Sequence, residues 1–427
     1  MTRRVVITGM GPVTAIGIGK DQFFQNLYVH KTNIHPIPKN YFQYYPFKSK
    51  YYVPLPEFSF AEYNIPTGYE KAMQAEDRMT VLATMLALED AGFSVESDGK
   101  KLRVDELNDC PVVMGTGLSG LENGFLGYVD HVMVDKAAKE QYFQVAHFKR
   151  MVIPMLMPNS TAAWASIMFS QTGRSHTVNA ACASGTYAVG DAFRLIRDGY
   201  SQVALTGGVE NLGDKRGAIM RGFDMLGVLT DSENGDPRSF SKQRSGFLFA
   251  EGGACVFMLE ELEHARQRGA EIYAEIIDFQ ATSDASSIVR LDPSGKQIER
   301  MMRGLAAHGS LDYLNTHGTG TQNNDEVEAS VIRQVFGDYT QQPYLNSTKA
   351  ILGHTLGASG AIEAAVAAMA INTGKLHSNL ITDPLDDLNL VHETMVQPIR
   401  LAASTSYGFG GHNGGLLFGA VDKNETS

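Results

Sequence analysis

Short apolar runs with β-branched residues alternate along the chain with stretches of helical periodicity, and this alternation limits the fold more than any other feature of the sequence. Strands and helices that alternate in this way pack as an α/β fold. Glycines mark the ends of several elements, and Gly207 and Gly208 are expected to close a strand. In the first half, the predicted strands are residues 4–8, 111–114, 176–181 and 203–206, and the predicted helices are residues 77–91 and 184–198.

The second half of the chain repeats this pattern. Small residues stand where a helix begins in both halves, at 179–186 and at 356–361, and small residues let another backbone come close. We therefore expect two similar halves packed on each other, residues 1–260 and residues 261–427, rather than two independent domains. The predicted elements of the second half are strands at 312–315 and 344–347 and an alanine-rich helix at 361–373.

Composition and charge exclude several classes of protein. The 427 residues are 43% hydrophobic and 19% charged, so the chain can bury a large core. A net charge of −11 argues against nucleic acid as the main partner. Cys110, Cys182 and Cys255 are too few and too scattered for a disulfide framework or a zinc site. Neither a targeting signal nor an apolar stretch of ~18 residues is found, so we expect a cytoplasmic protein without a membrane span.

Cys182 lies where a predicted strand ends and a predicted helix begins, between Ala181 and Ala183. A sharp turn at such a junction lifts a side chain into a cavity. The unpaired N–H groups and partial positive charge of a helix N-terminus lower the pKa of a thiol placed there. Cys182 is therefore a candidate nucleophile, and a small buried cysteine that packs like alanine is the alternative.

Two histidines, His317 and His354, follow predicted strands of the second half, and the adjacent Gly318 and Gly353 are expected to leave room for a ligand. A single histidine is more often an ordinary core or surface residue than a functional one. Both histidines, however, follow strand ends, as Cys182 does, and one edge of such a sheet collects its functional loops. The sequence therefore predicts that these three side chains converge on one cavity.

Lys349 lies five residues before His354. It is either a solvated charge or the partner of a buried acid. Three acidic residues are candidates to neutralise it or to orient the histidines: Asp325, Glu328 and Glu363.

Residues 406–415 form a dense glycine run around Phe409. The run lacks the Lys-Ser/Thr ending of a phosphate loop, so nucleotide binding is not indicated. We interpret the run as a mobile turn in which Phe409 is a movable plug.

Three motifs, in this order, resemble those of the β-ketoacyl-acyl-carrier-protein synthases of the type I/II kind, which have the thiolase fold. The resemblance extends over nearly the whole chain, from residues 5–11 to residues 408–411. The motifs are Ala-Cys-Ala-Ser-Gly at 181–185, His-Gly-Thr-Gly-Thr at 317–321 and Lys-Ala-Ile-Leu-Gly-His at 349–354.

The resemblance implies an α/β thiolase fold with two duplicated βαβαβαββ halves in a five-layer αβαβα arrangement, and a dimer. It implies that Cys182 accepts an acyl group from a carrier protein as a thioester. His317 and His354 would polarise the thioester carbonyl of a malonyl group, whose loss of carbon dioxide gives an enolate. The enolate would attack the acyl-Cys and extend the chain by two carbons. Two neutral imidazoles suit this chemistry, because an enolate oxygen needs hydrogen-bond donors aimed at it.

The resemblance also implies roles for other residues. No metal and no cofactor are implied, apart from the phosphopantetheine arm of the carrier protein that holds the substrates. The backbone N–H groups of Cys182 and Phe409 would form the oxyanion hole, and Lys349 and Glu328 would support the histidines. Thr319 and Thr321 would bind the pantetheine arm. The acyl pocket and its gate would be formed by Leu118, Phe223 and Phe409.

Related subfamilies differ at these positions. Thiolases carry a second catalytic cysteine near the C-terminal glycines, where this chain has none. The type III and chalcone-like synthases use asparagine where His354 stands. Chain-length factors, the inactive partners in type II polyketide systems, lack the nucleophile, and Cys182 is present here. The chain is therefore expected to be a competent condensing subunit.

The sequence departs from the family pattern in places. Residues 240–246 lack two acidic positions of a motif that is common in the family. Compared with the housekeeping enzyme, the segment 284–317 is short and the segment 121–153 is long. We expect residues 121–153 to form a surface excursion at a subunit contact. An acidic carrier protein needs a basic landing site. Lys71 and Arg78 are interleaved with acidic residues, so the candidates are Lys149, Arg150, Lys215 and Arg216, with an ordinary solvated face as the alternative.

These departures favour a specialised type II system that makes a polyketide or a polyene. The expected partners are an acyl carrier protein and either a second copy of the chain or a Cys-less chain-length-factor paralogue. Housekeeping fatty-acid elongation is one alternative. The others are thiolase-like acyl transfer without decarboxylation and a chain-length-determining scaffold without catalytic activity.

Overall fold

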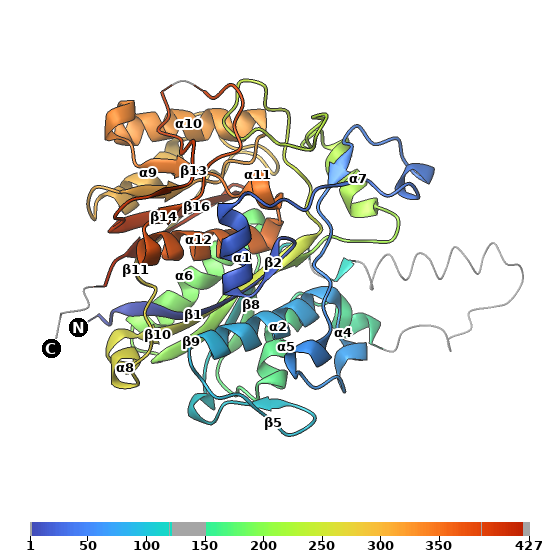
Figure 1. Cartoon of the computed structure of the whole chain (residues 1–427), viewed down its shortest axis with the longest axis vertical. Coiled ribbons are helices and arrows are strands. Elements are labelled where there is room, and N and C mark those ends of the chain that lie inside the picture. Colours follow the sequence, from blue (N-terminus) through green and yellow to red (C-terminus); the bar gives the residue numbers. More distant parts are fainter. Residues whose placement is uncertain (1, 119, 122–150, 386, 422–427) are drawn as a thin grey trace, which may run out of the picture.

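The computed structural model describes residues 2–118, 120–121, 151–385 and 387–421, and its elements form five layers (Figure 1). Two layers of strands alternate with three layers of helices, and the middle helices are covered by strands on both sides. This arrangement confirms the expected α/β class and its five-layer order. One outer helical layer contains α9 (Lys296–Ala306) and α10 (Gln322–Phe336). The middle layer contains α6 (Ser184–Arg197) and α12 (Ser359–Thr373). The other outer layer contains α2 (Ala75–Asp90) and α5 (Ser160–Met168).

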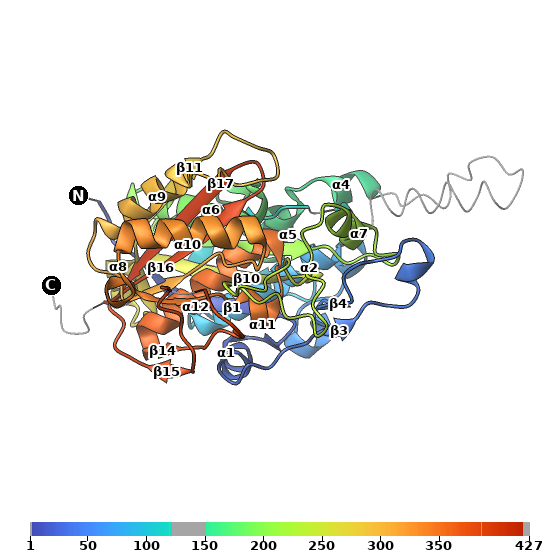
Figure 2. The same ribbon diagram turned by 90° about the horizontal axis from the view of Figure 1, so that it is seen from above.

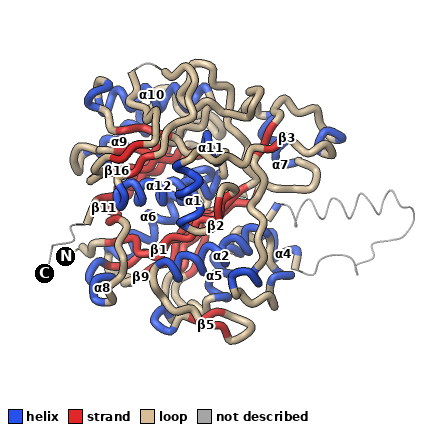
Figure 3. Tube along the Cα trace, viewed as in Figure 1, coloured by secondary structure: helices blue, strands red, loops and turns tan. Residues whose placement is uncertain are grey.

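The strands of both layers belong to one hydrogen-bonded path, in the order β13-β12-β16-β17-β11-β1-β10-β9-β7-β8. Five strands come from each half of the chain, and the halves meet where β1 pairs with β11 in a short antiparallel contact between Val5 and Ile276 and between Ile7 and Ala274 (Figure 3). The strands are β1 (Val5–Thr14), β7 (Val112–Gly115), β8 (Ser175–Val178), β9 (Val203–Asn211), β10 (Gly252–Glu261), β11 (Ala274–Ser283), β12 (Tyr313–Asn315), β13 (Tyr344–Asn346), β16 (Leu401–Gly408) and β17 (His412–Gly419).

Glycines extend two strands that we expected to be shorter. β9 continues through Gly207 and Gly208. Both positions need glycine, because a Cβ at Gly207 would lie 2.0 Å from the Cys255 carbonyl oxygen and a Cβ at Gly208 would lie 2.7 Å from the Gly357 carbonyl oxygen. These glycines therefore permit close packing and do not end the strand. β1 likewise runs past Gly9 and Gly11 to Thr14, and both glycines lie against the backbone of α2.

The middle helices α6 and α12 begin in the same way. Each follows a short 3-10 turn whose first residue has a positive φ, 50° at Ala181 and 43° at Leu356. The serine at each helix start accepts a hydrogen bond from the N–H four residues earlier, at 2.9 Å for Ser184 and 3.2 Å for Ser359. Figure 2 shows the layers from above, with α10 in front. In the middle layer α6 and α12 are in contact, and a Cβ at Gly185 of α6 would be 2.7 Å from the Ala361 nitrogen of α12.

The α12 region is a long apolar helical segment. Residues Leu356–Thr373 are long and apolar enough to cross a membrane by composition, but 89% of this stretch is buried inside the protein. Its hydrophobicity is accounted for by its place in the central layer, where helices are covered on both sides.

The remaining elements are short and lie around these layers. Residues 30–63 are mostly loop, and residues 122–150, most of the segment for which we expected a surface excursion, lie outside the described residues. The elements are α1 (Lys20–Tyr28), α4 (Val152–Leu156), α7 (Ala218–Met225), α8 (Leu262–Gln267), α11 (Lys349–Leu352), β2 (Gly17–Ile18), β3 (His35–Pro36), β4 (Tyr51–Tyr52), β5 (Glu96–Ser97), β6 (Leu102–Arg103), β14 (Lys375–Leu376) and β15 (Met395–Val396).

Candidate active site

Cys182 lies in the middle of the 3-10 turn Ala181–Ala183, directly before α6. The turn is held by Ser184, whose hydroxyl donates to the Ala181 carbonyl at 2.6 Å and accepts from the Ala180 N–H. The positive φ of Ala181 is strained for a residue with a side chain, and such strain is typical of functional turns. The predicted sharp turn at the nucleophile is therefore present, although β8 ends at Val178 and not at residue 181.

Two cavities meet at Cys182. A cavity of about 530 Å³ is lined by Cys182, His317 and His354 together. A second cavity of about 740 Å³ is mostly apolar and also reaches Cys182. Phe223, Leu226, Leu356 and Phe409 line both cavities, so these four side chains stand between the two spaces.

The two imidazoles lie side by side in the smaller cavity. The ring centroids of His317 and His354 are 5.4 Å apart and the rings are nearly perpendicular, at 84°. His354 Nδ1 is 3.0 Å from the Ser359 hydroxyl, and a hydroxyl that donates to Nδ1 leaves the ring proton on Nε2. His317 packs edge-on against Tyr407, and its buried Nδ1 has no hydrogen-bond partner among the described residues.

Both imidazoles are electrically neutral near pH 7. Burial holds the pKa of His317 and of His354 well below the usual 6.5, and the positive charge of Lys349 lowers each pKa further. Lys349 lies at the start of α11 and forms a buried salt bridge with Glu363 of α12. Of the two interpretations of Lys349, the partnered one is therefore correct, and Glu363 is its partner.

The Cys182 thiol is protonated at rest, which contradicts the lowered pKa that we expected. Burial raises its pKa to about 12, and this effect outweighs the lowering by Lys349 and by hydrogen bonds from the backbone N–H groups of Phe409 and Cys182. Only 6% of the residue is exposed. A helix N-terminus stabilises a thiolate by too little to offset its removal from water.

Most of the glycine run around Phe409 lies in two paired strands, and only residues 409–411 form the turn between them. Gly408 ends β16, His412 begins β17, and these two strands pair along their whole length, including Gly414 and Gly415. Phe409 lies in the tight connection between them and borders both cavities. Its N–H and that of Cys182 lie near the Cys182 sulfur, and both lower the pKa of the thiol.

Glu328 and Asp325 of α10 act on backbone groups, and neither forms a hydrogen bond to an imidazole ring or to Lys349. The Glu328 carboxylate accepts from the N–H groups of His317 at 2.9 Å and of Gly318 at 2.8 Å, and burial raises its pKa to about 7. Asp325 accepts from the N–H groups of Phe240 and Gly320. The two acids therefore fix the loop that carries His317. The salt bridge of Lys349 is with Glu363, although the Lys349 charge also lowers the pKa of Glu328.

The glycines beside the histidines do not leave room for a ligand. A Cβ at Gly318 would lie 2.6 Å from the Ser347 side chain, and one at Gly353 would lie 2.9 Å from Ala250. Both residues also have a positive φ. That expectation was wrong, because the space beside these glycines is filled by protein.

The other predicted binding residues divide between the two cavities. Thr319 and Thr321 line the smaller cavity, and their hydroxyls are 2.9 Å apart. Leu118 lines the larger, apolar cavity, and Phe223 borders both. All of these side chains open toward the space around Cys182.

Sequence reasoning missed two residues of this region. Ser359 holds the Nδ1 of His354, and Glu210 holds three backbone N–H groups beside the larger cavity. Glu210 could have been found, because it is an acid at the end of an apolar strand. Ser359 could have been found from its equivalence to Ser184 at the start of the other middle helix.

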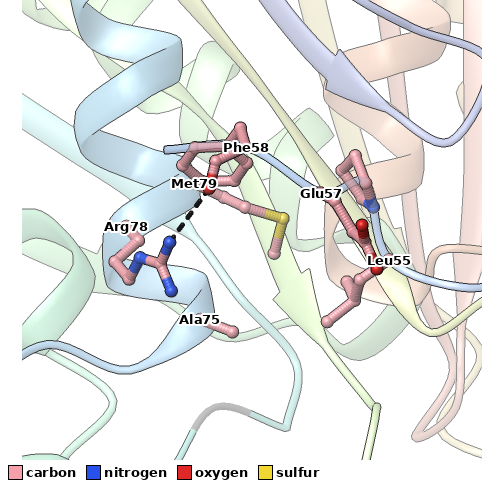
Figure 4. Close-up of a pocket in the computed structure, with 7 residues that line it drawn as sticks. Leu55, Glu57, Phe58, Ala75, Arg78 and Met79 are labelled. Atoms are coloured by element: carbon pink, nitrogen blue, oxygen red, sulfur yellow. Dashed lines mark hydrogen bonds between the residues drawn. The ribbon is translucent and has the colours of Figure 1, made fainter. Parts of the chain in front are cut away.

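The basic residues considered for docking differ in their surroundings. Arg78 is already engaged, since it donates to the Phe58 carbonyl at 3.1 Å and pairs with Glu70, and it lines a small pocket with Phe58 and Met79 (Figure 4). Arg216 lies over the ring of Tyr44. Lys215 is its neighbour in the chain, and both residues lie in the loop just before α7, a helix that lines the larger cavity. Lys149 and Arg150 lie outside the described residues.

No group of three or more His, Cys, Asp or Glu side chains that could hold a metal ion occurs in residues 2–118, 120–121, 151–385 and 387–421. The three cysteines are free and buried. The chemistry that the described residues offer is therefore that of one thiol, two neutral imidazoles and the N–H groups near the thiol.

Comparison with known proteins agrees with this geometry over nearly the whole chain. The chain is 32% identical to the 3-oxoacyl-[acyl-carrier-protein] synthase 2 of Synechocystis sp. and 33% identical to that of Rhizobium meliloti, with 97% of this chain and 98% of each relative covered. A β-ketoacyl synthase from Burkholderia phymatum has a similar structure, with a TM-score of 0.85 at 28% identity over 98% of this chain and 100% of that chain.

A second similar structure is the ketosynthase complex described as a type II PKS acyl-carrier protein with its ketosynthase bound to the hexaketide, with a TM-score of 0.84 at 26% identity over 99% of this chain and 100% of that chain. Residues 2–265 match the model of the β-ketoacyl synthase N-terminal domain, and residues 273–383 match that of the C-terminal domain. The chain therefore belongs to the β-ketoacyl synthase family.

Proposed function

We propose that the chain is a condensing β-ketoacyl synthase that joins a malonyl unit on a carrier protein to an acyl group held on Cys182, with loss of carbon dioxide. The observation that carries this proposal is that Cys182, His317 and His354 line one cavity of about 530 Å³. One nucleophile and two neutral hydrogen-bond donors are the set that such a condensation requires.

The first half-reaction loads the acyl group. The Cys182 thiol attacks the carbonyl of an acyl thioester, and its proton passes to a neutral imidazole of the cavity and then to the leaving pantetheine thiolate. The N–H groups of Cys182 and Phe409 lie near the sulfur, so they are suited to stabilise the oxyanion of the tetrahedral intermediate that forms there. A new thioester forms at Cys182 and the old one breaks.

The second half-reaction extends the chain. The malonyl thioester loses carbon dioxide, and the electron pair of the broken bond moves to the thioester oxygen, where His317 and His354 donate hydrogen bonds to it. The enolate carbon then attacks the acyl-Cys carbonyl and the thiolate of Cys182 leaves. Lys349 supports the neutral state of both imidazoles, because its positive charge opposes their protonation.

The two cavities suit the two parts of the substrate. Thr319 and Thr321 offer hydroxyls in the smaller cavity, which fits the amide-rich pantetheine arm. Leu118 and Phe223 give the larger cavity apolar walls, which fits an acyl chain. We assign Phe409 as the gate between the cavities, because it borders both.

The pathway that we propose is type II polyketide or polyene synthesis, with an acyl carrier protein as partner and a homodimer or a pair with a Cys-less paralogue as the working unit. The type II ketosynthase with its acyl-carrier protein and the ishigamide ketosynthase/chain length factor, at 26% and 27% identity, support this choice. Fatty-acid elongation is the second candidate, favoured by the 32–33% identity to the 3-oxoacyl synthases. We further propose a cytoplasmic location and two related halves, residues 1–260 and 261–427.

The test is incubation with malonyl- and acyl-carrier protein. The proposal expects release of carbon dioxide, a ketoacyl product and an acyl adduct on Cys182 by mass spectrometry, and it expects Cys182→Ala to abolish loading. Unchanged extension by Cys182→Ala, or turnover of coenzyme A thioesters without malonate, contradicts it. If Cys182 resists a cerulenin-like electrophile and activity depends on the cysteine of a second subunit, this chain is a scaffold subunit and not the catalytic one.

A further inference from the structure

Glu210 is a fully buried carboxylate near the end of β9, and it accepts hydrogen bonds from the backbone of two loops beside the larger cavity. Its Oε2 accepts from the N–H groups of Gly117 at 2.9 Å and of Gly357 at 3.0 Å, and its Oε1 accepts from the N–H of Leu118 at 2.9 Å. Gly117 and Leu118 follow β7, whereas Gly357 lies in the turn before α12. One side chain therefore joins loops from both halves of the chain.

The two loops that Glu210 joins both contribute to the wall of the larger, apolar cavity. Leu118 and Leu356, the neighbour of Gly357, both line the cavity that reaches Cys182. The loops approach so closely that a Cβ at Gly117 would lie 2.5 Å from Glu210 Oε2, and one at Gly357 would lie 2.8 Å from the same oxygen. The carboxylate therefore contacts both loops where they meet directly, since a Cβ at Gly357 would also lie 2.5 Å from the Gly117 nitrogen, and it fixes how the two walls lie relative to each other.

A further contact links the clamped loop to the nucleophile. Asn179 Nδ2 donates to the Gly117 carbonyl at 2.8 Å, and Asn179 Oδ1 accepts from the N–H of Ala181 at 3.2 Å. Ala181 directly precedes Cys182. Displacement of the Gly117 loop is thus transmitted to the turn that carries the thiol.

We propose that Glu210 is a positioning residue that determines which acyl chains the Cys182 pocket accepts, because it fixes Leu118 and Leu356 at one separation. This inference rests on the proposed function, since it assumes that Cys182 is acylated. Glu210 forms no hydrogen bond to the thiol or to the imidazoles, although its charge raises the pKa of Cys182. A change in that pKa acts on acyl chains of every length alike, whereas a change in the shape of the pocket distinguishes chains by length. An unpaired backbone N–H in a buried loop is costly, so loss of one contact displaces the loop.

Glu210→Gln is the sharpest test, because the amide keeps the size of the side chain. Its single oxygen can accept from Gly117 and Gly357, and its NH₂ group then faces the N–H of Leu118, donor against donor. This orientation loses one hydrogen bond, the one from Leu118, whereas the reverse orientation loses the two from Gly117 and Gly357. The variant is therefore expected to release Leu118 selectively.

The experiment measures acyl loading of Cys182 by mass spectrometry, with the full-length enzyme and an equimolar mixture of acyl-carrier proteins of increasing chain length. We expect wild type to prefer one length and Glu210→Gln to lose roughly ten-fold of its discrimination against longer chains, a loss typical of a relaxed apolar pocket. The matched control is Glu260→Gln, which removes an equally buried carboxylate from the adjacent strand β10, where it pairs with Arg268. This control is expected to lower thermal stability without changing the chain-length profile.

Three results overturn the inference: an unchanged profile in Glu210→Gln, a uniform loss of loading at all chain lengths, or the same shift in Glu260→Gln. If Glu210→Gln does not fold, Gly357→Ala tests the clamp from its other side, because its Cβ would lie 2.5 Å from the Gly117 nitrogen. This variant is expected to shift the profile as well, and an unchanged profile contradicts the inference. Absence of any acyl adduct on wild-type Cys182 is a separate outcome that defeats the proposed function itself.

Discussion

The ammonium group of Lys349 is paired with the carboxylate of Glu363 in the interior, where each side chain is only 2% exposed. Lys349 lies on α11 and Glu363 on the central helix α12, so the pair joins two elements behind the cavity. The positive charge of Lys349 lowers the pKa of His317, of His354 and of Cys182. A single buried charge thus acts on all three proposed catalytic side chains, and Glu363 compensates it.

Glu363→Gln should destabilise the protein by about 3–5 kcal/mol, because it leaves the Lys349 charge buried without a partner. The double variant Lys349→Met/Glu363→Leu removes both charges and should recover most of the free energy of unfolding, but not the activity. Urea unfolding of the wild type and both variants, with carbon dioxide release measured in parallel, checks this. A double variant with full activity would show that the Lys349 charge has no role at the site.

Alkylation of Cys182 should become faster with pH across the whole range from 7 to 10. Burial raises the pKa of this thiol to about 12, so the thiolate fraction increases about ten-fold for each pH unit below that value. Iodoacetamide labelling at a series of pH values, followed by mass spectrometry, measures the rate. Cys182→Ala is the control, and it should remain unlabelled because Cys110 and Cys255 are buried and, unlike Cys182, line neither of the two cavities. A plateau below pH 8 contradicts the protonated resting state.

His317→Ala and His354→Ala should each lower decarboxylation of malonyl-carrier protein by about 10²–10³-fold, as expected for loss of one donor to the enolate oxygen. Acyl loading of Cys182 should decrease less. Because both imidazoles have a pKa well below 6.5, wild-type decarboxylation should not change between pH 6.5 and 8. His308→Ala, a change of a partly exposed histidine near Asp278, should leave the rate unchanged. A rate that increases with a midpoint near pH 7 would show that an imidazole is charged at rest.

The three site positions were predictable from the sequence because each follows a strand, and strand ends collect at one edge of a sheet. Cys182, His317 and His354 do line one cavity. The pKa of Cys182 was not predictable, because it depends on burial by Phe223, Leu356 and other residues that are distant in the sequence. Local signals such as a helix N-terminus are visible in sequence, whereas desolvation is a property of the assembled core.

The glycines show the same limit for the fold. A glycine was expected to end a strand at Gly207 and to open space beside His317, yet both glycines at these places permit close packing. Whether a missing side chain makes room for a ligand or for another backbone depends on what lies opposite, which the sequence does not state. The serines that begin α6 and α12, by contrast, were part of a visible similarity between the halves, and the structure gives both the same hydrogen bond.

Glu76→Gln should change how stability depends on pH. Burial raises the pKa of Glu76 from 4.5 to about 7, so the folded protein binds this proton more tightly than the unfolded chain does. The stability that this group contributes is therefore present below pH 4.5 and is lost as the pH rises toward 7, by about 3 kcal/mol at 1.36 kcal/mol for each pH unit. Chemical unfolding from pH 5 to 7 should show the variant gaining relative to wild type as the pH rises. A constant difference across this range contradicts the raised pKa.

Gly185→Ala should lower the free energy of unfolding by about 1–3 kcal/mol, although alanine is the better helix former by about 1 kcal/mol. The added Cβ would lie 2.7 Å from the Ala361 nitrogen and 3.0 Å from the Gly357 carbonyl oxygen, and neither backbone atom can rotate away. The two central helices must therefore separate, and the turn that carries Cys182 begins one of them, so acyl loading should slow as well. Gly68→Ala is the control, since no atom lies within 4 Å of its added Cβ, and it should change the free energy of unfolding by less than about 0.5 kcal/mol. Equal stability of the two variants, measured by urea unfolding, would mean that the contact between α6 and α12 is looser than the structure shows.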